Sequence, residues 1–489
     1  MKKYDVIIVG LGPTGGTLAA LLAIHGFSIL IIEKEKCFYP LPRAVHFDDE
    51  VMRVFQTIGI TDKFLKNTII NKGTKFVNSK NKVVLDWPRL RSITDNGWYP
   101  SYRFNQPDLE RKLRSRLKDF KKVFIMQNTK VISLKEDKDS VKIFLEDVNN
   151  KKIKVITSKY VIGCDGANST IRKQIKAKFQ NLGFTQKWAV VDLILKKDKK
   201  ELPDRTIQYS NPKRPATYCR NVGKRRRWEF AIRNSESEKK VLSNSYIWNF
   251  LKPWLKPRDA FMERKTIYTF QSAISKKWKK GRIFLAGDAA HLMPPFMGQG
   301  MCAGIRDASN LSWKIAYCLK NSHSENLLNT YQSERYSNVR EYIKTTVKMG
   351  EFINAIGSSN ITGEVSSSPD GQQSMKSIKP KLGKGLGKVK DKNRGKIFPQ
   401  LKTKNGKLLD DKFSLKPILI LSKEIKSKFS NKLNIIYSKN NKNLEKFFKN
   451  SNSIAVIVRP DRFILSSCKS VKNFKSYLSK NLSFLALFE

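Results

Sequence analysis

The sequence feature that most constrains the fold is a glycine pattern near the N-terminus, between an apolar strand and a helix. Residues 4–9 are mostly β-branched and predict a strand, and Gly10-Leu11-Gly12-Pro13-Thr14-Gly15 follows at once. Residues 16–26 then predict a helix, and a second strand, 28–32, ends at Glu33. In this context the glycines let a pyrophosphate approach the helix N-terminus, and Glu33 is placed to bond a ribose hydroxyl. The N-terminal part therefore predicts a dinucleotide-binding unit.

A second pattern lies at a strand-to-helix crossing. The apolar run 282–286 predicts a buried strand, and the apolar spacing of 301–320 predicts a helix. Between them come Asp288, two prolines, and then Gly298 and Gly300. Open α/β sheets bind ligands at such crossings, and glycines at a helix start let a ligand approach the backbone. An ordinary glycine-rich loop is the alternative, but the acid, prolines and glycines in this order weaken it.

A third pattern occupies residues 160–172. A predicted strand ends in Asp165-Gly166, and a helix follows after Ser169. Asp165 could also be only a turn acid, and Ser169 only a helix cap. Like the first two patterns, this one lies at the end of a predicted strand, but taken alone it is ambiguous.

Two single residues belong to the same group of candidates. Arg43 precedes a predicted helix at 48–58, where it could also be an ordinary surface cation. Gln106 precedes a predicted helix at 108–117, where it could also be a helix cap.

The rest of the chain has a different pattern of apolar residues. Residues 179–270 carry alternating runs separated by turns and predict a mostly antiparallel sheet, to which strands within 76–87 are added. Residues 357–398 are rich in Ser, Gly and Lys and predict a long linker or loop. The fold class is α/β. We expect a nucleotide-binding domain in three parts (1–74, 101–178 and 271–350) and a sheet domain in two parts (75–100 and 179–270). A linker (351–399) and a C-terminal module (400–489) follow.

The net charge of +53 would suit nucleic acid or an anionic surface. Lysine is nevertheless spread over the whole chain, which favours a compositional bias over a binding patch. The densest basic run, 224–227, is followed by Trp-Glu-Phe, and we expect a solvated turn that leads into a strand. Nucleic acid is therefore an unlikely partner and stays a minor alternative.

The cysteines and histidines exclude several classes of site. The six cysteines are scattered without a Cys-x-x-Cys, which favours a reducing cytoplasm over a disulfide framework or zinc site. With four histidines, a metal centre is not expected. No apolar run reaches the length that a membrane span needs, and together with the scattered cysteines this predicts a cytoplasmic protein.

Together the three patterns resemble the FAD-dependent aromatic hydroxylases, flavoprotein monooxygenases of the para-hydroxybenzoate hydroxylase type. The resemblance implies a Rossmann-like FAD-binding domain with an inserted antiparallel β-sheet substrate domain. It implies FAD as cofactor and NADH or NADPH as co-substrate. By the same resemblance Asp288 would bond the ribityl chain, and the loop after it would lie along the flavin ring. The implied cofactor-binding residues are Gly10, Gly12, Pro13, Thr14, Gly15, Glu33, Lys34, Arg43, Gln106, Val131, Asp165, Gly166, Asp288, Pro295, Gly298, Gly300 and Met301.

The tail resembles one branch of that family. Residues 398–400 and 456–461 are similar to the C-terminal thioredoxin-like module of the branch that includes 3-(3-hydroxyphenyl)propionate hydroxylase, and residues 42–50 and 298–308 are close to that branch as well. The tail has no Cys-x-x-Cys, so it is not a redox module. Because all three nucleotide patterns precede it, we expect it to be separable. Strands are predicted within it at 418–421, 433–437, 454–458 and 463–466.

The branch implies an activity. Reduced flavin would react with O₂ to a C4a-hydroperoxide, whose distal oxygen is transferred to a phenol ring ortho to its hydroxyl, and the substrate would be a 3-(3-hydroxyphenyl)propionate-like acid. His46 and Asp48 lie near the expected flavin edge and are candidates for the catalytic base, although core packing or helix capping explains each as well.

Three readings compete with a hydroxylase. A FAD-dependent reductase or a halogenase would share the nucleotide fold, but no halogenase-type Trp-x-Trp-x-x-Ile stretch is present. A basic, nucleic-acid-associated flavoprotein is the third. A homodimer is possible in each case.

Overall fold

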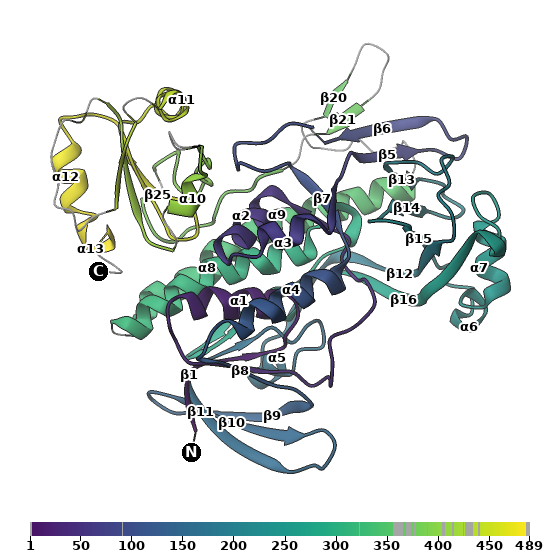
Figure 1. The fold of residues 1–489 in the computed structure, drawn as a ribbon, viewed down its shortest axis with the longest axis horizontal. Coiled ribbons are helices and arrows are strands. Elements are labelled where there is room, and N and C mark those ends of the chain that lie inside the picture. The colour runs from purple at the N-terminus through teal and green to yellow at the C-terminus, as the bar shows by residue number, and fades with distance from the viewer. Residues whose placement is uncertain are drawn as a thin grey trace.

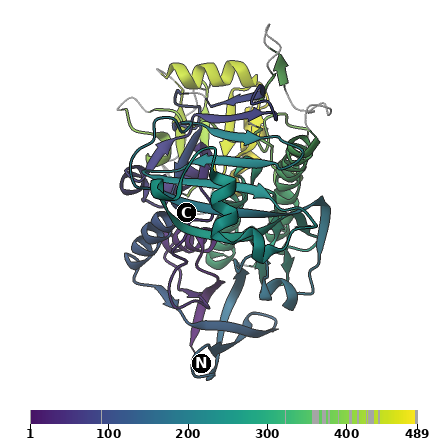
Figure 2. The ribbon, with the colours of Figure 1, turned by 90° about the vertical axis from the view of Figure 1, so that its right-hand side faces the viewer.

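The computed structural model describes the chain apart from residues 1, 90, 322, 356–364, 368–372, 376–377, 389, 403–405, 413–414, 424, 426–433, 439–440 and 486–489. Parts of the predicted linker 351–399 and of the predicted strand 433–437 thus lie outside the described residues. Figure 1 shows the nucleotide-binding sheet in the centre, a second sheet at one end and the C-terminal module at the other. Figure 2 shows the N-terminus at the bottom and the module, in yellow-green, at the top.

The central sheet has the strand order β17-β18-β11-β1-β2-β8, and β9 and β10 extend it through β11. β1 pairs in parallel with β2 and β11, and β11 pairs in parallel with β18. The carboxyl ends of β1, β11 and β18 therefore lie at one edge of the sheet, which is where the three sequence patterns begin. The strands are β1 (Lys3–Val9), β2 (Ile29–Ile32), β8 (Val123–Met126), β9 (Thr129–Glu136), β10 (Val141–Asp147), β11 (Ile153–Gly163), β17 (Lys279–Lys280) and β18 (Ile283–Leu285).

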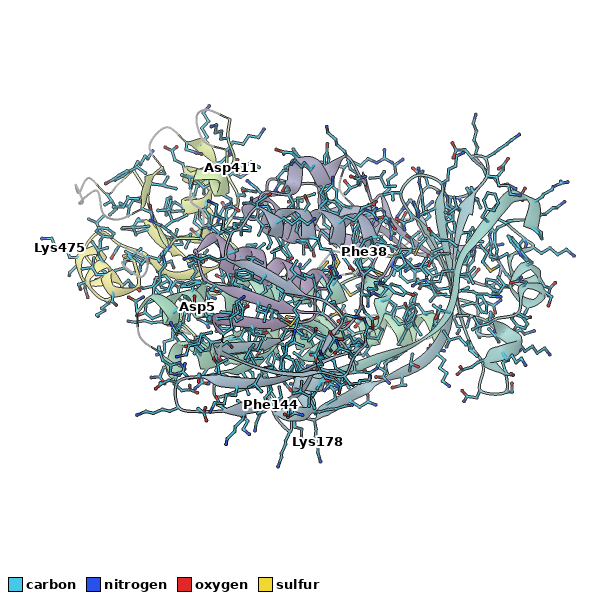
Figure 3. All side chains as sticks on the ribbon, turned by 60° about the horizontal axis from the view of Figure 1, so that its bottom comes forward. Asp5, Phe38, Phe144, Lys178, Asp411 and Lys475 are labelled. Carbon is cyan, nitrogen blue, oxygen red and sulfur yellow. The ribbon has the colours of Figure 1, made fainter. Side chains whose placement is uncertain are left out.

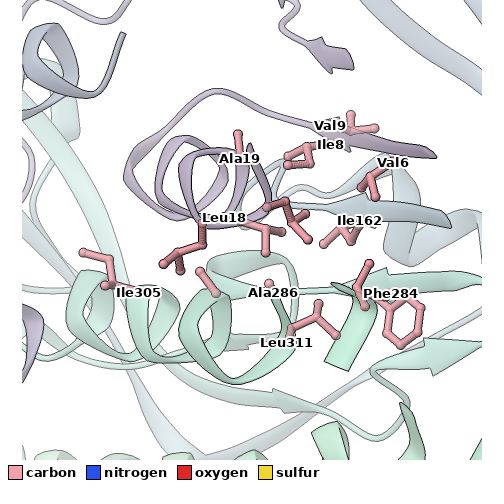
Figure 4. Packing of buried hydrophobic residues seen from close by; sticks show 14 of the residues in the cluster. Val6, Ile8, Val9, Leu18, Ala19, Ile162, Phe284, Ala286, Ile305 and Leu311 are labelled. Atoms are coloured by element: carbon pink, nitrogen blue, oxygen red, sulfur yellow. The ribbon is translucent and has the colours of Figure 1, made fainter. Parts of the chain in front are cut away.

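Helices α1 and α8 cover this sheet. Figure 4 shows Leu18 of α1 and Leu311 of α8 beside Ile162 and Phe284 of the strands. Small residues in α1 allow this close approach to both neighbours. The helices of this part are α1 (Pro13–Ile24), α2 (Asp49–Thr57), α3 (Thr61–Leu65), α4 (Gln106–Lys118), α5 (Thr170–Gln174), α8 (Gly300–Lys320) and α9 (Glu325–Ala355), and the small sheet beside them consists of β3 (His46–Asp48), β4 (Thr68–Ile70) and β7 (Ser101–Phe104).

The second sheet has the order β19-β16-β12-β15-β14-β13-β5-β6-β21-β20. Its central pairs are antiparallel as predicted, whereas β13 and β5 run parallel. Both of its faces are covered: Trp188 and Val190 belong to one apolar cluster, and Ala189 and Val191 to another. The elements are β5 (Gly73–Val77), β6 (Val83–Pro88), β12 (Phe179–Leu195), β13 (Thr206–Tyr209), β14 (Ala216–Arg220), β15 (Arg225–Ala231), β16 (Ala260–Ser275), β19 (His291–Leu292), β20 (Val365–Ser367), β21 (Gln373–Met375), α6 (Glu238–Val241) and α7 (Asn244–Leu251).

The C-terminal module has a sheet of order β23-β22-β24-β25, in which β22 and β23 are parallel and the other pairs antiparallel. Its assignment to the thioredoxin fold stays a prediction. Phe398, from the predicted linker, is buried in the core of the module. The elements are α10 (Leu409–Lys412), β22 (Ile418–Leu421), β23 (Ile435–Tyr437), α11 (Lys442–Ser451), β24 (Ala455–Val458), β25 (Ile464–Cys468), α12 (Phe474–Ser479) and α13 (Leu482–Leu485).

The basic run 224–227 is not the solvated turn that the sequence predicted. Lys224 lies in a turn, but Arg225 already begins β15, and Arg226 and Arg227 are 6% and 4% exposed. The prediction was wrong because β15 is an inner strand, between β12 and β14, of a sheet whose two faces are both covered. Elsewhere, nitrogen-tipped side chains project around the whole outline in Figure 3, in agreement with the even spread of lysine. None of the helices that the structure describes is long and apolar enough to cross a membrane.

Candidate functional site

The motif glycines between β1 and α1 meet different surroundings. Gly10 has a φ of +101°, and a Cβ there would lie 2.5 Å from the carbonyl oxygen of Cys164. A Cβ on Gly15 would overlap the carbonyl oxygen of Gly10. At Gly12, by contrast, no described atom lies within 4 Å of the same position. The packing of the protein therefore requires Gly10 and Gly15, whereas the open face of Gly12 leaves room for a ligand.

Backbone donors and a carboxylate border that open face. Gly12 is the N-cap of α1 and supplies no side-chain cap, and no acid occupies the first turn of this helix, all of which is described. The N–H groups of such a turn suit an anion. Glu33, at the end of β2, accepts the N–H of Leu11 at 2.8 Å, so its carboxylate lies beside the loop.

Two predicted residues near Glu33 present different surfaces. The side chain of Lys34 is exposed and pairs with Glu35 at 3.6 Å. The side chain of Val131 is buried in the core. A ligand can therefore reach only the backbone of Val131.

The third pattern forms a hydrogen-bonded turn after β11. Ser169 donates to Asp165 Oδ1 at 2.5 Å, and it caps α5 by accepting the N–H of Arg172 at 2.9 Å. Burial raises the pKa of Asp165, although the hydrogen bonds that its carboxylate accepts from Ser169 and Ile171 lower it. Arg172 donates to the carbonyl of Ala289 at 3.1 Å and thereby ties this turn to the one that carries Asp288.

The Asp288 turn is fixed from both sides. Gly287 has a φ of +63°, and a Cβ there would lie 2.7 Å from Thr14 Oγ1, so the first and second patterns are in contact. From α8, Asp307 accepts the N–H of Gly287 at 3.0 Å and also binds His291 Nε2 at 2.6 Å. Asp288 itself is open to solvent, although the protein atoms crowded around it desolvate the carboxyl and raise its pKa. An accessible acid in a recess is what a bound polar ligand needs.

The loop before α8 packs against His46. Gly298 has a φ of +65°, and a Cβ there would lie 2.7 Å from His46 Nδ1. The ring bonds Gly298 O through Nδ1 at 3.2 Å and Ser101 Oγ through Nε2 at 2.7 Å. Burial, reinforced by nearby arginines, lowers the pKa of His46 to about 3, so the imidazole is neutral.

Asp48 lies in a network of its own. It caps α2 by accepting the N–H of Val51 at 3.1 Å, and it accepts from Gln299 Nε2 at 3.1 Å and Arg306 Nη2 at 2.5 Å. Burial opposes its ionisation, but the neighbouring charges and hydrogen bonds, chiefly those of Arg306, together outweigh burial and lower the pKa of Asp48. Arg306 also pairs with Glu50 at 2.7 Å, which joins the starts of α2 and α8.

The loop at Pro42–Ala44 is held between two elements. Gln106, the first residue of α4, accepts the N–H of Ala44 at 2.7 Å. Arg227 of β15 donates to the carbonyls of Arg43 and Pro42 at 2.7 and 2.8 Å. The Arg43 side chain is half exposed and lies 3.8 Å from Glu110.

The face of the second sheet toward this loop mixes buried charge and aromatic rings. Asp192 stands opposite both Arg227 and Arg264 in the strand register and binds their Nε atoms at 2.7 and 2.9 Å. Arg264 donates to Tyr268 OH at 3.0 Å. The rings of Trp188, Phe270 and Phe296 pack together further along the same face.

Sequence reasoning missed Asp192, Arg227 and Arg264. The available signal was an acid inside the apolar run 188–195, because a buried carboxylate requires a cationic partner.

Two surface cavities lie elsewhere. One, of about 770 Å³, is lined by Lys276, Lys279 and Lys384 among others. Another, of about 710 Å³, lies at the rim of the second sheet beside Gln186 and Glu236. Neither is lined by a residue of the three patterns, so neither marks the nucleotide site.

Comparison with known proteins identifies the family. Residues 3–346 match the model of a family described as an FAD binding domain. A probable NADH-specific resorcinol 4-hydroxylase of Rhodococcus jostii (strain RHA1) is 36% identical over 405 residues, which cover 82% of this chain and 75% of that protein. The chain belongs to the FAD-dependent aromatic hydroxylase family. A 3-(3-hydroxy-phenyl)propionate/3-hydroxycinnamic acid hydroxylase of Mycolicibacterium smegmatis is 33% identical over 352 residues, but these span 71% of this chain and only 61% of that protein.

Solved structures agree on the fold. Aklavinone-11 hydroxylase, in complex with FAD and aklavinone, superposes with a TM-score of 0.80 over 99% of both chains at 16% identity. The p-nitrophenol 4-monooxygenase PnpA of Pseudomonas putida gives a TM-score of 0.65 at 21% identity, over 76% of this chain and 91% of that one.

FAD is the cofactor of this family, and the residues present fit it. The open face of Gly12 and the uncapped start of α1 suit its pyrophosphate, and Glu33 and Asp288 offer accessible carboxylates to its hydroxyl groups. The start of α8 at Gly300 likewise lacks a side-chain cap. Which of these residues contact the cofactor stays a prediction.

Proposed function

We propose that the protein uses NAD(P)H and O₂ to hydroxylate a phenolic ring ortho to its hydroxyl, with a 3-(3-hydroxyphenyl)propionate-like acid as substrate. The observation that carries the proposal is the charged and aromatic face of β12, β15 and β16, which meets the loop Pro295–Met297 through Phe296. The names of the relatives support it: resorcinol and 3-(3-hydroxyphenyl)propionate are both phenols with a second substituent meta to the hydroxyl.

FAD, when bound, supplies the redox and oxygen chemistry, and the protein binds and orients the ring and excludes water. Phe296 is partly exposed and packs against the buried rings of Trp188 and Phe270, so it offers an apolar surface to an aromatic ring. Tyr268 accepts a hydrogen bond from Arg264, and a hydroxyl that accepts in this way can also donate its own proton to a phenol oxygen. Tyr268 is therefore our candidate for orienting the hydroxyl that directs the reaction.

The catalytic assignment of His46 and Asp48 stays a prediction, and their contacts favour positioning. Both ring nitrogens of His46 are bonded, one of them to Gly298 O. Asp48 is committed to the α2 cap, Gln299 and Arg306. We infer that the two side chains fix the loop between Gly298 and the start of α8.

A substrate panel tests the proposal. The purified, FAD-loaded protein is mixed with NADH or NADPH and with 3-(3-hydroxyphenyl)propionate, resorcinol or 3-phenylpropionate, which lacks the hydroxyl. We expect a meta-substituted phenol to stimulate NAD(P)H oxidation at least about tenfold and 3-phenylpropionate to have no effect, because substrate gating is common in such enzymes. Tyr268→Phe should lower kcat/KM about fivefold, because the loss of one hydrogen bond worth about 1 kcal/mol corresponds to a factor of about five. No stimulation by any phenol would refute the proposal, and stimulation by resorcinol alone would move the substrate away from an acid.

A further inference from the structure

A buried ionic cluster joins the C-terminal module to the helices of the FAD-binding domain. Glu334 of α9, 0% exposed, accepts from Arg459 Nη1 and Nη2 at 2.8 and 2.9 Å and from Lys314 Nζ of α8 at 2.8 Å. Asn310 of α8 donates to both Glu334 and Asp461 at 3.0 Å. We name these five residues the Glu334 cluster. Burial opposes ionisation of Glu334, but Arg459 and Lys314 outweigh it and lower its pKa, so the cluster is charged at neutral pH.

A second cluster holds helix α2. Arg53 binds the two carboxylate oxygens of Asp410 at 2.9 and 3.0 Å and donates to the carbonyl of Phe398 at 2.6 Å. Arg462, on the turn between β24 and β25, lies 3.1 Å from the same carboxylate. We name Arg53, Asp410 and Arg462 the Asp410 cluster. Its side chains are at most 7% exposed.

Both helices held in this way begin at the flavin site. α8 starts at Gly300, and Asn310 follows about 15 Å along the axis at 1.5 Å per residue. α2 is capped by Asp48, and Arg53 lies one turn further on. Arg306 joins the two starts through Asp48 and Glu50. Figure 1 shows α8 running from the centre of the molecule toward the end that carries the module.

The chemistry of these contacts suits positioning more than stability. A buried ion pair adds little net stability over an apolar contact of the same shape, but it tolerates few geometries, and loss of one partner costs about 3–5 kcal/mol. Helix α2, held by the bidentate Arg53–Asp410 pair, and helix α8, held through Asn310 and Lys314, therefore cannot slide or rotate as they could on an apolar surface. We propose that Arg459 and Asp410 of the C-terminal module are positioning residues for the FAD site, which act by fixing α8 and α2. This proposal depends on FAD binding and not on the choice of substrate.

The test compares FAD affinity with apo-protein stability. The full-length apo-protein of each variant is titrated with FAD at a temperature well below its own thermal unfolding, and the flavin fluorescence and visible spectrum are recorded. Arg459→Met should raise the Kd for FAD at least tenfold and change the spectrum of the bound flavin. Arg459→Lys, which keeps one donor for Glu334, should recover part of the affinity.

Arg214→Met is the matched control. It breaks the partly buried pair with Glu236, between two loops beside the second sheet, and it should leave the Kd for FAD within twofold of wild type. If Arg459→Met does not fold, Asp410→Asn, which keeps the size of the side chain, takes its place with the same expectation. A folded Arg459→Met or Asp410→Asn variant with a Kd within twofold of wild type, or no different from the control, would overturn the proposal.

Discussion

Single residues of the site separate into those that the fold needs and those that a ligand needs. Gly10 and Gly15 are pressed against other backbone atoms, whereas Gly12 faces open space. Its φ of −80° is one that any residue adopts.

Gly12→Val should therefore leave the fold intact and remove FAD. The apo-protein should unfold within about 1 kcal/mol of wild type, since the new side chain meets no described atom, while FAD content after purification should fall at least tenfold. Gly15→Ala is the contrasting variant, because its methyl group overlaps the Gly10 carbonyl and should destabilise the apo-protein itself. Full FAD occupancy in a folded Gly12→Val variant would show that the pyrophosphate does not bind at this loop.

His46 gives a prediction about pH. Its pKa is lowered to about 3 by burial, from an ordinary value near 6.5, so between these values the unfolded chain binds a proton that the native protein does not. The contribution of the neutral His46 to the free energy of unfolding is therefore full above about pH 6.5. It falls by about 1.4 kcal/mol per pH unit as the pH is lowered toward 3. Denaturant unfolding between pH 7 and about 5 should show a smaller loss in His46→Gln than in wild type. An unchanged slope would contradict the neutral, buried imidazole; His323→Gln, at an exposed position, serves as the control.

Among the helices and strands, α8 is the element that links the parts of the site to one another. It begins at Gly300, meets α2 through Arg306, anchors the Asp288 turn through Asp307, meets the C-terminal module through Asn310 and binds Glu334 of α9 through Lys314. These contacts fall on successive turns of one helix, so a shift of the helix would displace all of them together.

Asp307→Ala should unfix the Asp288 turn. The change removes the acceptor of the Gly287 N–H and leaves Arg335, 1% exposed, without its carboxylate partner at 2.8 Å. A loss of about 3–5 kcal/mol in the free energy of unfolding follows, together with loss of most of the bound FAD. Chemical unfolding and the flavin absorbance per protein measure both. Asn321→Ala, at the far end of α8, should change neither, and an Asp307→Ala protein with normal FAD content would show that the turn does not need this anchor.

The elements of the nucleotide-binding unit could be predicted to within a few residues because their periodicity is strong. The predicted helix 301–320 is α8, which begins one residue earlier at Gly300. Charged residues in strands could not be placed in this way. The run around Arg227 looks like a surface turn in one dimension, and only the register that sets Asp192 opposite it explains its burial.

Across the whole molecule, the tail is more closely joined than its sequence suggested. Composition predicted a linker and a separable module, but the Glu334 and Asp410 clusters bury charged partners from both sides of that boundary. Long-range pairing of this kind leaves no local pattern in the sequence, whereas the three nucleotide patterns are local and were found. The contacts therefore argue against a module that can be removed without consequence.

The origin of the inserted oxygen tests the central claim, that this chain is a FAD-dependent hydroxylase of a phenolic acid. The FAD-loaded protein is incubated with NADH, 3-(3-hydroxyphenyl)propionate and ¹⁸O₂, and the product is analysed by mass spectrometry. We expect a catechol that carries a single ¹⁸O atom, formed in proportion to the NADH consumed. Label that arrives from ¹⁸O-water instead, or the absence of any hydroxylated product from a protein with bound FAD, would contradict it.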